Sequence, residues 1–243
     1  MSNVSFSFLP EALQVQAFEA VAGGVQLSVA TVILTIVLEL ASMPTIRGVL
    51  KQRDGKSLYS QAITVNFLNH FVFGIPVYAF AGVLLCTKTL ASNYVVFAVR
   101  ATAVLTAHAI LYYAIHRAFH IYPQLYVYHR FHHKFNTHVP PVAANAVSIV
   151  EYLLAYVLPF AVAALFIRPH ETEFRFAIAF ASVANLLVHT PRLEELSKNL
   201  WPMFVSTHDH QEHHRRLTTN YASPTIKVDW IIQQFSSISG KKA

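Results

Sequence analysis

The chain has 243 residues, of which 54% are hydrophobic and only 12% are charged, against roughly 25% charged in an ordinary soluble domain. So little polar surface cannot cover a soluble globule, and the composition therefore predicts a membrane protein. The net charge of +6 does not indicate a nucleic-acid-binding protein, because the basic residues lie between apolar runs. The single cysteine, Cys86, excludes an intrachain disulfide and any multi-thiolate metal site, which leaves His, Asp and Glu for metal chemistry.

Three apolar runs predict membrane-spanning helices, at residues 22–43, 62–86 and 94–115. Each has about the 20 residues that a helix needs to cross the hydrocarbon core. No lysine or arginine precedes Arg47, so the start of the chain lacks the basic segment of a cleaved signal peptide. The first run is therefore expected to be a retained span.

Two later runs, at residues 142–167 and 174–188, are shorter or carry a charge, Glu151. We expect them to form a tight helical hairpin, at about 142–188, that only partly crosses the membrane. The predicted fold class is all-α: a polytopic membrane bundle of four to five segments with a histidine-rich cytosolic cap.

No internal repeat or inter-domain linker divides the chain, so residues 1–243 are expected to form one membrane domain. Its spans are predicted in residues 1–115, and a histidine-rich region is predicted in residues 116–243.

The basic residues predict the orientation of the spans. If the N-terminus faces away from the cytosol, fourteen of the eighteen lysines and arginines lie on the cytosolic side, as the positive-inside rule requires. They are Arg47, Lys51, Arg53, Lys56, Arg117, Arg130, Lys134, Arg192, Lys198, Arg215, Arg216, Lys227, Lys241 and Lys242.

Two polar residues, Glu39 and Asn69, lie at membrane depth, where polar groups are costly. They indicate either a functional role or a hydrogen bond that bridges helices.

Eleven of the fourteen histidines lie in two short windows, at residues 108–138 and 208–214. Within these windows the spacing is i, i+4 or i, i+3, i+4, which places side chains on one face of a helix. The three boxes are His116 and His120; His129, His132 and His133; and His210, His213 and His214. Each box is expected to aim two or three imidazoles at one place.

Imidazole is a ligand for iron, zinc, copper and nickel, and eight imidazoles are more than one four-coordinate ion can take. A histidine run can also be a non-specific metal-binding tract, but the same H-x-x-H-H spacing occurs twice, some 80 residues apart. The pattern therefore predicts a specific site for two ions. The isolated His70 and His170 are expected to be hydrogen-bonded surface residues.

At these residues the chain resembles the fatty acid hydroxylase/sterol desaturase superfamily, whose members carry H-R-x-x-H, H-x-x-H-H and a late H-x-x-H-H followed by Asn-Tyr. The resemblance covers roughly residues 108–230. Besides the three boxes, the residues that carry it are Tyr113, Arg117, His189, Asn220, Tyr221, Asp229 and Trp230.

The resemblance implies a membrane diiron oxidoreductase that uses O2 and external electrons to hydroxylate or desaturate a lipid of the sterol or fatty acyl type. It implies two Fe ions, with zinc as an alternative in a purified or inactive form, and His189 as a ninth ligand. The implied partners are a lipid from the bilayer and an electron donor such as cytochrome b5 or a reductase. Acceptors for the outer ring nitrogens are expected among Glu151, Asp209, Glu212 and Asn220.

The chain departs from the family pattern at several positions. Ala109 replaces an acidic residue, Ala222 replaces a glycine, and the Phe-Gly-Thr ending is absent. Ser148 replaces a histidine, so one iron is expected to have fewer ligands, and His138 or His208 is a candidate replacement.

Three other functions fit part of the pattern. A catalytically inactive relative would bind metal or lipid as a scaffold. A metal transporter would place its site near the midplane between broken helices, and a haem-binding cytochrome would place histidine pairs on separate spans. The expected location is the endoplasmic reticulum membrane in a eukaryote or the inner membrane in a bacterium.

Overall fold

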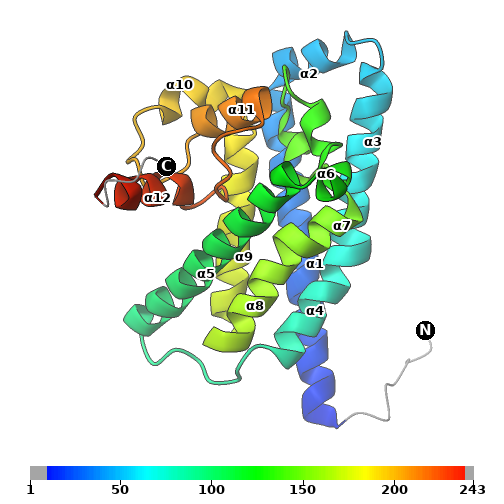
Figure 1. Cartoon of the computed structure of the whole chain (residues 1–243). Coiled ribbons are helices and arrows are strands. Elements are labelled where there is room, and N and C mark those ends of the chain that lie inside the picture. The colour runs from blue at the N-terminus through cyan, green and yellow to red at the C-terminus, as the bar shows by residue number, and fades with distance from the viewer. Residues whose placement is uncertain (1–9, 239–243) are drawn as a thin grey trace, which may run out of the picture.

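A computed structural model describes residues 10–238, and these contain helices and no β-strand. The predicted all-α polytopic bundle is thus confirmed (Figure 1). The helices are α1 (Glu11–Ala41), α2 (Met43–Leu50), α3 (Gly55–Phe67), η1 (Leu68–Gly74), α4 (Ile75–Leu84), α5 (Tyr94–Ile121), α6 (Pro123–His129), η2 (His132–Lys134), η3 (Pro141–Asn145), α7 (Ile149–Glu151), η4 (Tyr152–Val157), α8 (Leu158–Ile167), α9 (Glu171–Val188), η5 (Pro191–Leu193), α10 (Glu194–Ser197), α11 (Thr207–Arg216) and α12 (Val228–Ile238).

Within the described residues, four continuous helical stretches are long and apolar enough to cross a membrane: Glu11–Ala41, Gly55–Leu84, Tyr94–Ile121 and Ile149–Ile167. The fifth segment, α9, meets the short helix Pro191–Ser197 at an angle of 84°. Large apolar side chains on the outside of the bundle, such as Phe166 at 80% exposure, suit a surface that faces acyl chains. The chain is therefore an integral multi-pass membrane protein.

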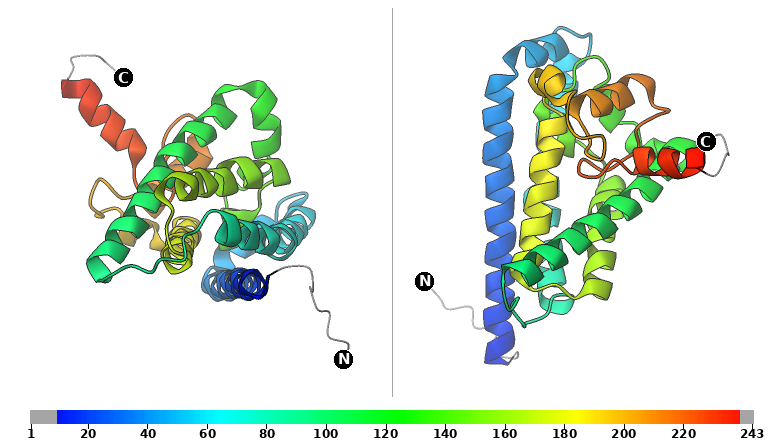
Figure 2. Two further views of the ribbon diagram at one scale, coloured as in Figure 1. Left: turned by 90° about the horizontal axis from the view of Figure 1, so that it is seen from below. Right: turned by 90° about the vertical axis from the view of Figure 1, so that its left-hand side faces the viewer.

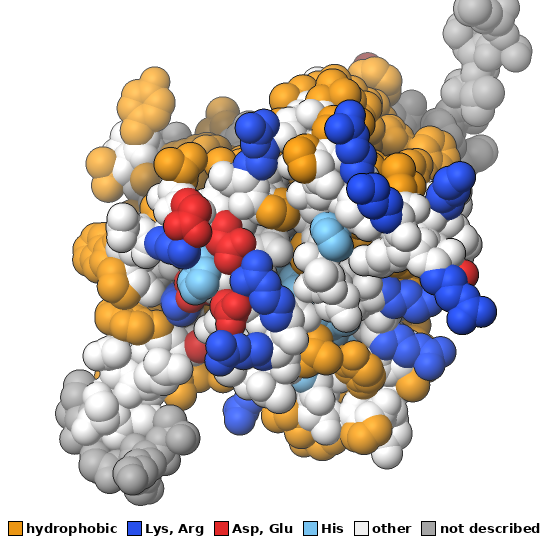
Figure 3. All heavy atoms as spheres, turned by 90° about the horizontal axis from the view of Figure 1, so that it is seen from above, with side chains coloured by type: hydrophobic (Ala, Val, Ile, Leu, Met, Phe, Trp, Pro, Cys, Tyr) orange, Lys and Arg blue, Asp and Glu red, His pale blue; other side chains and the backbone are white. Residues whose placement is uncertain are grey.

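The spans pack α1 against α4 and α9, and α5 against α8 and α9. Helices α2, α10 and α11 gather at one end of the bundle, whereas α12 lies across the direction of the spans (Figure 2). Lysine and arginine side chains gather on the face at that end (Figure 3), as the charge pattern predicts.

The expected hairpin at 142–188 differs from the structure at its start. The helix begins only at Ile149, because Ser148 has an extended backbone and its side chain caps the helix. Residues 141–147 instead form a buried, mostly 3₁₀ segment. The stretch Ile149–Ile167 is long and apolar enough to cross a membrane, and the partial crossing of the hairpin stays a prediction.

Polar side chains from neighbouring helices satisfy the backbone of this buried segment, which we call the 141–147 segment. Glu39 Oε1 accepts a hydrogen bond from the backbone N–H of Val142, at 2.7 Å. Asn69 Nδ2 donates to the carbonyl oxygens of Asn145 and Val147, at 3.1 and 3.0 Å. Glu39 and Asn69 thus bridge helices to an irregular backbone that would otherwise be unsatisfied. Further bonds come from Asn66, Tyr156 and Asn185.

Candidate metal centre

All nine histidines predicted as metal ligands lie together in two groups, and the ligand atoms within each group lie within 4.8 Å of one another. The first, the five-histidine group, contains His116, His120, His129, His133 and His213. The second, the four-histidine group, contains His132, His189, His210 and His214. Every ring except that of His120 is buried.

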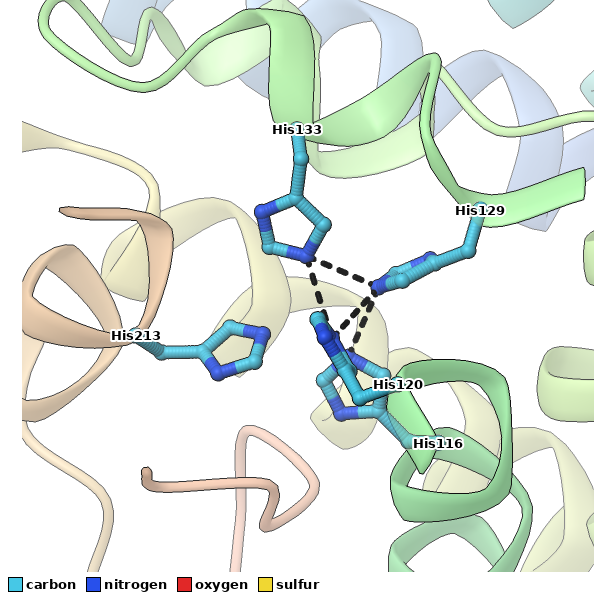
Figure 4. A group of neighbouring side chains, drawn as sticks. All are labelled: His116, His120, His129, His133 and His213. Carbon is cyan, nitrogen blue, oxygen red and sulfur yellow. Dashed lines mark hydrogen bonds between the residues drawn. The ribbon is translucent and has the colours of Figure 1, made fainter. Parts of the chain in front are cut away.

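The five-histidine group draws its side chains from α5, the end of α6, η2 and α11, and their rings point at one another (Figure 4). His129 Nε2 lies 3.0 Å from His116 Nε2 and 3.0 Å from His120 Nε2. It also lies 2.8 Å from His133 Nε2. His213 faces the same space, and its buried Nε2 has no hydrogen-bond partner among residues 10–238.

The four-histidine group is built on His189, at the C-terminal end of α9. His189 Nε2 lies 2.9 Å from His210 Nε2, 3.3 Å from His214 Nε2 and 3.5 Å from His132 Nε2. The two groups are neighbours, because the ring centroids of His133 and His214 are 4.8 Å apart.

Five of the nine rings direct Nδ1 at an oxygen atom outside the groups. A carbonyl or carboxylate oxygen accepts, so Nδ1 donates in each of these rings, and Nε2 of the neutral ring is a lone pair aimed inward. The pairs are His116 with Tyr221 O at 2.9 Å, His129 with Glu151 Oε1 at 2.7 Å, His132 with Ala143 O at 3.1 Å, His189 with Asn185 O at 2.7 Å and His213 with Thr219 O at 2.7 Å.

This pattern fits a bound cation. His116 and His129 both donate through Nδ1, so the 3.0 Å contact between their Nε2 atoms joins two lone pairs and cannot be a hydrogen bond. The same holds for His132 and His189. Burial, followed by the neighbouring histidines, holds the pKa of His129 well below its usual value, so that ring stays neutral. Converging neutral imidazole lone pairs are what an iron or zinc ion requires.

The structure corrects the expectation that each box points at one place. In both H-x-x-H-H boxes the first and last histidines enter one group and the middle one enters the other. His129 and His133 belong to the five-histidine group, whereas His132 belongs to the four-histidine group. The last box divides in the same way within the continuous helix α11, so helical spacing accounts for the division. On a helix, residues i and i+4 project about 40° apart, whereas residue i+3 projects about 60° to the other side.

Of the four acceptors expected for outer ring nitrogens, only Glu151 is bonded to one, that of His129. Glu212 pairs with Arg215 and Arg216, at 2.9 and 2.7 Å. Asp209 caps α11 together with Ser206 and binds Lys227 at 2.6 Å, and Asn220 donates to Asp209 O at 3.0 Å. In residues 10–238 no bond joins Asp209, Glu212 or Asn220 to a ring of the two groups, so the expectation is wrong for these three.

Asn220 contributes through the backbone instead. Its φ of 56° is in the left-handed region, which asparagine tolerates better than most residues. The turn presents the carbonyl oxygens of Thr219 and Tyr221 to His213 and His116. Asp229 Oδ1 holds the turn by accepting from the Tyr221 N–H at 3.1 Å. Sequence reasoning missed these carbonyl acceptors, because every residue type carries a carbonyl.

The two candidate replacements for the missing histidine lie outside both groups. His138 lies beside Gln52, 3.5 Å between Nδ1 and Nε2, and His208 lies 3.2 Å from Glu194. Ser148 caps α7 by accepting from the Glu151 N–H at 3.1 Å. It thereby helps to start the helix whose third residue binds His129.

Burial of the imidazoles predicts a pH dependence of stability in the metal-free protein. Burial lowers the pKa of His189 and of His213 to about 4, from 6.5 for the free side chain. Between these values the unfolded chain binds more protons than the folded one, so stability is fully present above about pH 6.5 and is lost as the pH falls toward 4. Each such histidine contributes up to about 1.4 kcal/mol per pH unit. We expect chelator-treated protein to unfold at lower temperature at about pH 5 than at about pH 7; equal midpoints would contradict this.

A model of the fatty acid hydroxylase family matches residues 101–234, a range that includes all nine histidines and Glu151. No curated protein matches the chain, and no solved structure matches it. The family match covers more than half of the chain and contains both histidine groups, so the chain belongs to the fatty acid hydroxylase family, within the fatty acid hydroxylase/sterol desaturase superfamily.

Proposed function

We propose that the chain is a membrane-bound non-haem diiron oxidoreductase that uses O2 and external electrons to hydroxylate or desaturate a lipid. The observation that carries the proposal is the pair of adjacent groups of imidazoles, whose Nε2 atoms converge while five of the nine rings bond Nδ1 outward. Five and four histidines allow two ions, each with the multiple nitrogen ligands that a redox-active iron needs.

In this proposal the nine histidines hold two irons, and iron bound there would supply activation of dioxygen and oxidation of an unactivated C–H bond. The chain supplies the geometry. Glu151 and the carbonyl oxygens of Ala143 and Asn185 fix the tautomer and orientation of their rings. Burial excludes water, because the side chains of His129 and Glu151 are only 1% and 2% exposed.

The lipid would enter sideways from the bilayer, and we assign it to the sterol or fatty acyl type, used in lipid biosynthesis. Electrons would come from a separate donor, such as cytochrome b5 or a reductase. The basic end of the bundle (Figure 3) would face the cytosol and suit an acidic carrier. We place the protein in the endoplasmic reticulum membrane in a eukaryotic cell, or in the inner membrane of a bacterium.

The test is lipid analysis of a host that expresses the wild type, His132→Ala or His138→Ala. We expect a lipid that is one oxygen heavier, or two hydrogens lighter, with the wild type and with His138→Ala, whose histidine lies outside both groups. His132→Ala should give none. Equal amounts of product from all three hosts would contradict an oxygenase. The same conclusion would follow if the wild type binds iron and is supplied with a reductant but makes no product, and this result would favour a metal- or lipid-binding scaffold.

A further inference from the structure

A cavity of about 460 Å³ lies inside the bundle, between α1, the η1–α4 helix, the η4–α8 helix and α9. This volume lies within the roughly 300–1,000 Å³ of sites that take one small organic ligand. None of the described residues that line it is Asp, Glu, Lys or Arg. A charged headgroup placed there would be left unpaired in an apolar space, so the cavity suits a neutral ligand.

The cavity lies next to the metal centre. Asn145 lines it, and the carbonyl oxygen of Ala143, two residues earlier in the 141–147 segment, bonds to His132 Nδ1 at 3.1 Å. Tyr156 also lines the cavity, and its hydroxyl donates to Ala144 O at 2.9 Å. The 141–147 segment is thus shared by the cavity and by the four-histidine group.

Among the described residues that line this cavity, His70 has a buried side-chain nitrogen, Nε2, without a hydrogen-bond partner. The hydroxyls of Ser28 and Thr31, which also line the cavity, already bond to backbone oxygens at 3.0 and 2.8 Å. The expectation that His70 is hydrogen-bonded is therefore wrong for Nε2, and this nitrogen can bond to a ligand atom.

The backbone around His70 supports a binding role. His70 lies in η1, a π-helical stretch of the kind that often marks functional sites. The preceding residue, Asn69, holds the 141–147 segment through two hydrogen bonds. One stretch of helix therefore supports the wall of the metal centre and places an imidazole at the cavity.

We propose that this cavity binds a neutral lipid alcohol, with its hydroxyl hydrogen-bonded to His70 Nε2 and its apolar body filling the remaining space. A hydroxyl both donates and accepts, so it pairs with either tautomer of His70, whereas a carbonyl pairs only with the protonated Nε2. The rim includes Phe80, 64% exposed on a surface that would face acyl chains, so the ligand can enter from the bilayer. The assignment of this alcohol as the substrate rests on the proposed function.

The test is a competition binding assay on the full chain in lipid nanodiscs, with tritiated cholesterol and tritiated oleyl alcohol as probes. Cholestane and octadecene, which lack the hydroxyl, are the matched competitors. We expect the wild type to bind at least one alcohol about tenfold more tightly than its hydrocarbon, the usual effect of one buried hydrogen bond. Equal affinity for alcohol and hydrocarbon in both pairs would overturn the proposal without any variant.

Variants then test whether the preference for alcohol over hydrocarbon depends on His70. His70→Leu should lose this preference, whereas His70→Gln, which keeps a hydrogen-bonding group, should retain part of it. Thr31→Val is the matched control, because the Thr31 hydroxyl already bonds within its own helix. A preference that persists in His70→Leu, with a normal unfolding midpoint, would place the lipid elsewhere.

Binding requires neither iron nor oxygen, so it separates this inference from the proposed function. If His70→Leu loses the bound alcohol and also has a higher KM than the wild type, the result supports the substrate role. An unchanged KM overturns that role and identifies a resident lipid. Failure of the iron and product measurements would overturn the proposed function and leave the binding result standing.

Discussion

Alanine in place of His132 is expected to remove metal from the four-histidine group and to reduce bound iron by about half. Only three histidines of that group remain in the variant. Changing an outer hydrogen-bond partner of a ligand lowers metal affinity or activity 10- to 100-fold, and we expect loss of the ligand itself to lower them further. Turnover should therefore fall by more than about a hundredfold.

Alanine in place of the adjacent His133 provides the internal comparison. His133 belongs to the five-histidine group, which keeps four histidines in this variant, so we expect a smaller loss of metal and a different site of loss. The measurement is metal content per chain after purification, with His138→Ala as the control. Identical metal loss in the His132 and His133 variants would contradict the division into two groups.

Replacement of Glu151 tests the support of one ligand without removing it. Glu151 Oε1 accepts from His129 Nδ1 at 2.7 Å, and both side chains are buried. Glu151→Gln keeps an oxygen acceptor but loses the charge, and we expect metal affinity at the five-histidine group to fall 10- to 100-fold. The four-histidine group should keep its affinity, because its outer acceptors are carbonyl oxygens of other residues.

Glu151→Ala is expected to be worse in a second way. It leaves the N–H of His129 buried without an acceptor, which costs about 1–3 kcal/mol of folding free energy. Chelator competition measures the metal affinity, and unfolding of the metal-free protein measures the stability. Glu194→Gln, at an exposed ion pair with Arg215, serves as the control that should alter neither metal group. Unchanged metal affinity in both Glu151 variants would show that this hydrogen bond does not orient His129.

Particular residues show where sequence reasoning succeeds and where it stops. Hydropathy placed the spans because a bilayer demands long apolar helices. The spacing of the histidines selected eight of the nine that converge, and the family resemblance added His189. Proximity misled for Asp209, which lies next to His210 but binds Lys227 and Ser206. The metal-ligand role of the nine histidines remains a prediction.

The residues alone therefore indicated a helical membrane protein with a specific histidine-rich site, because the length of an apolar run and the type of each residue can be read directly from the sequence. Tertiary structure decided that two histidine groups lie side by side, so that His129 and His132, three residues apart, enter different groups. It also decided which carbonyl oxygens hold the rings and that the imidazole of His70 lines a cavity. Such features depend on which backbone atoms meet across the bundle, and local sequence does not encode those distances.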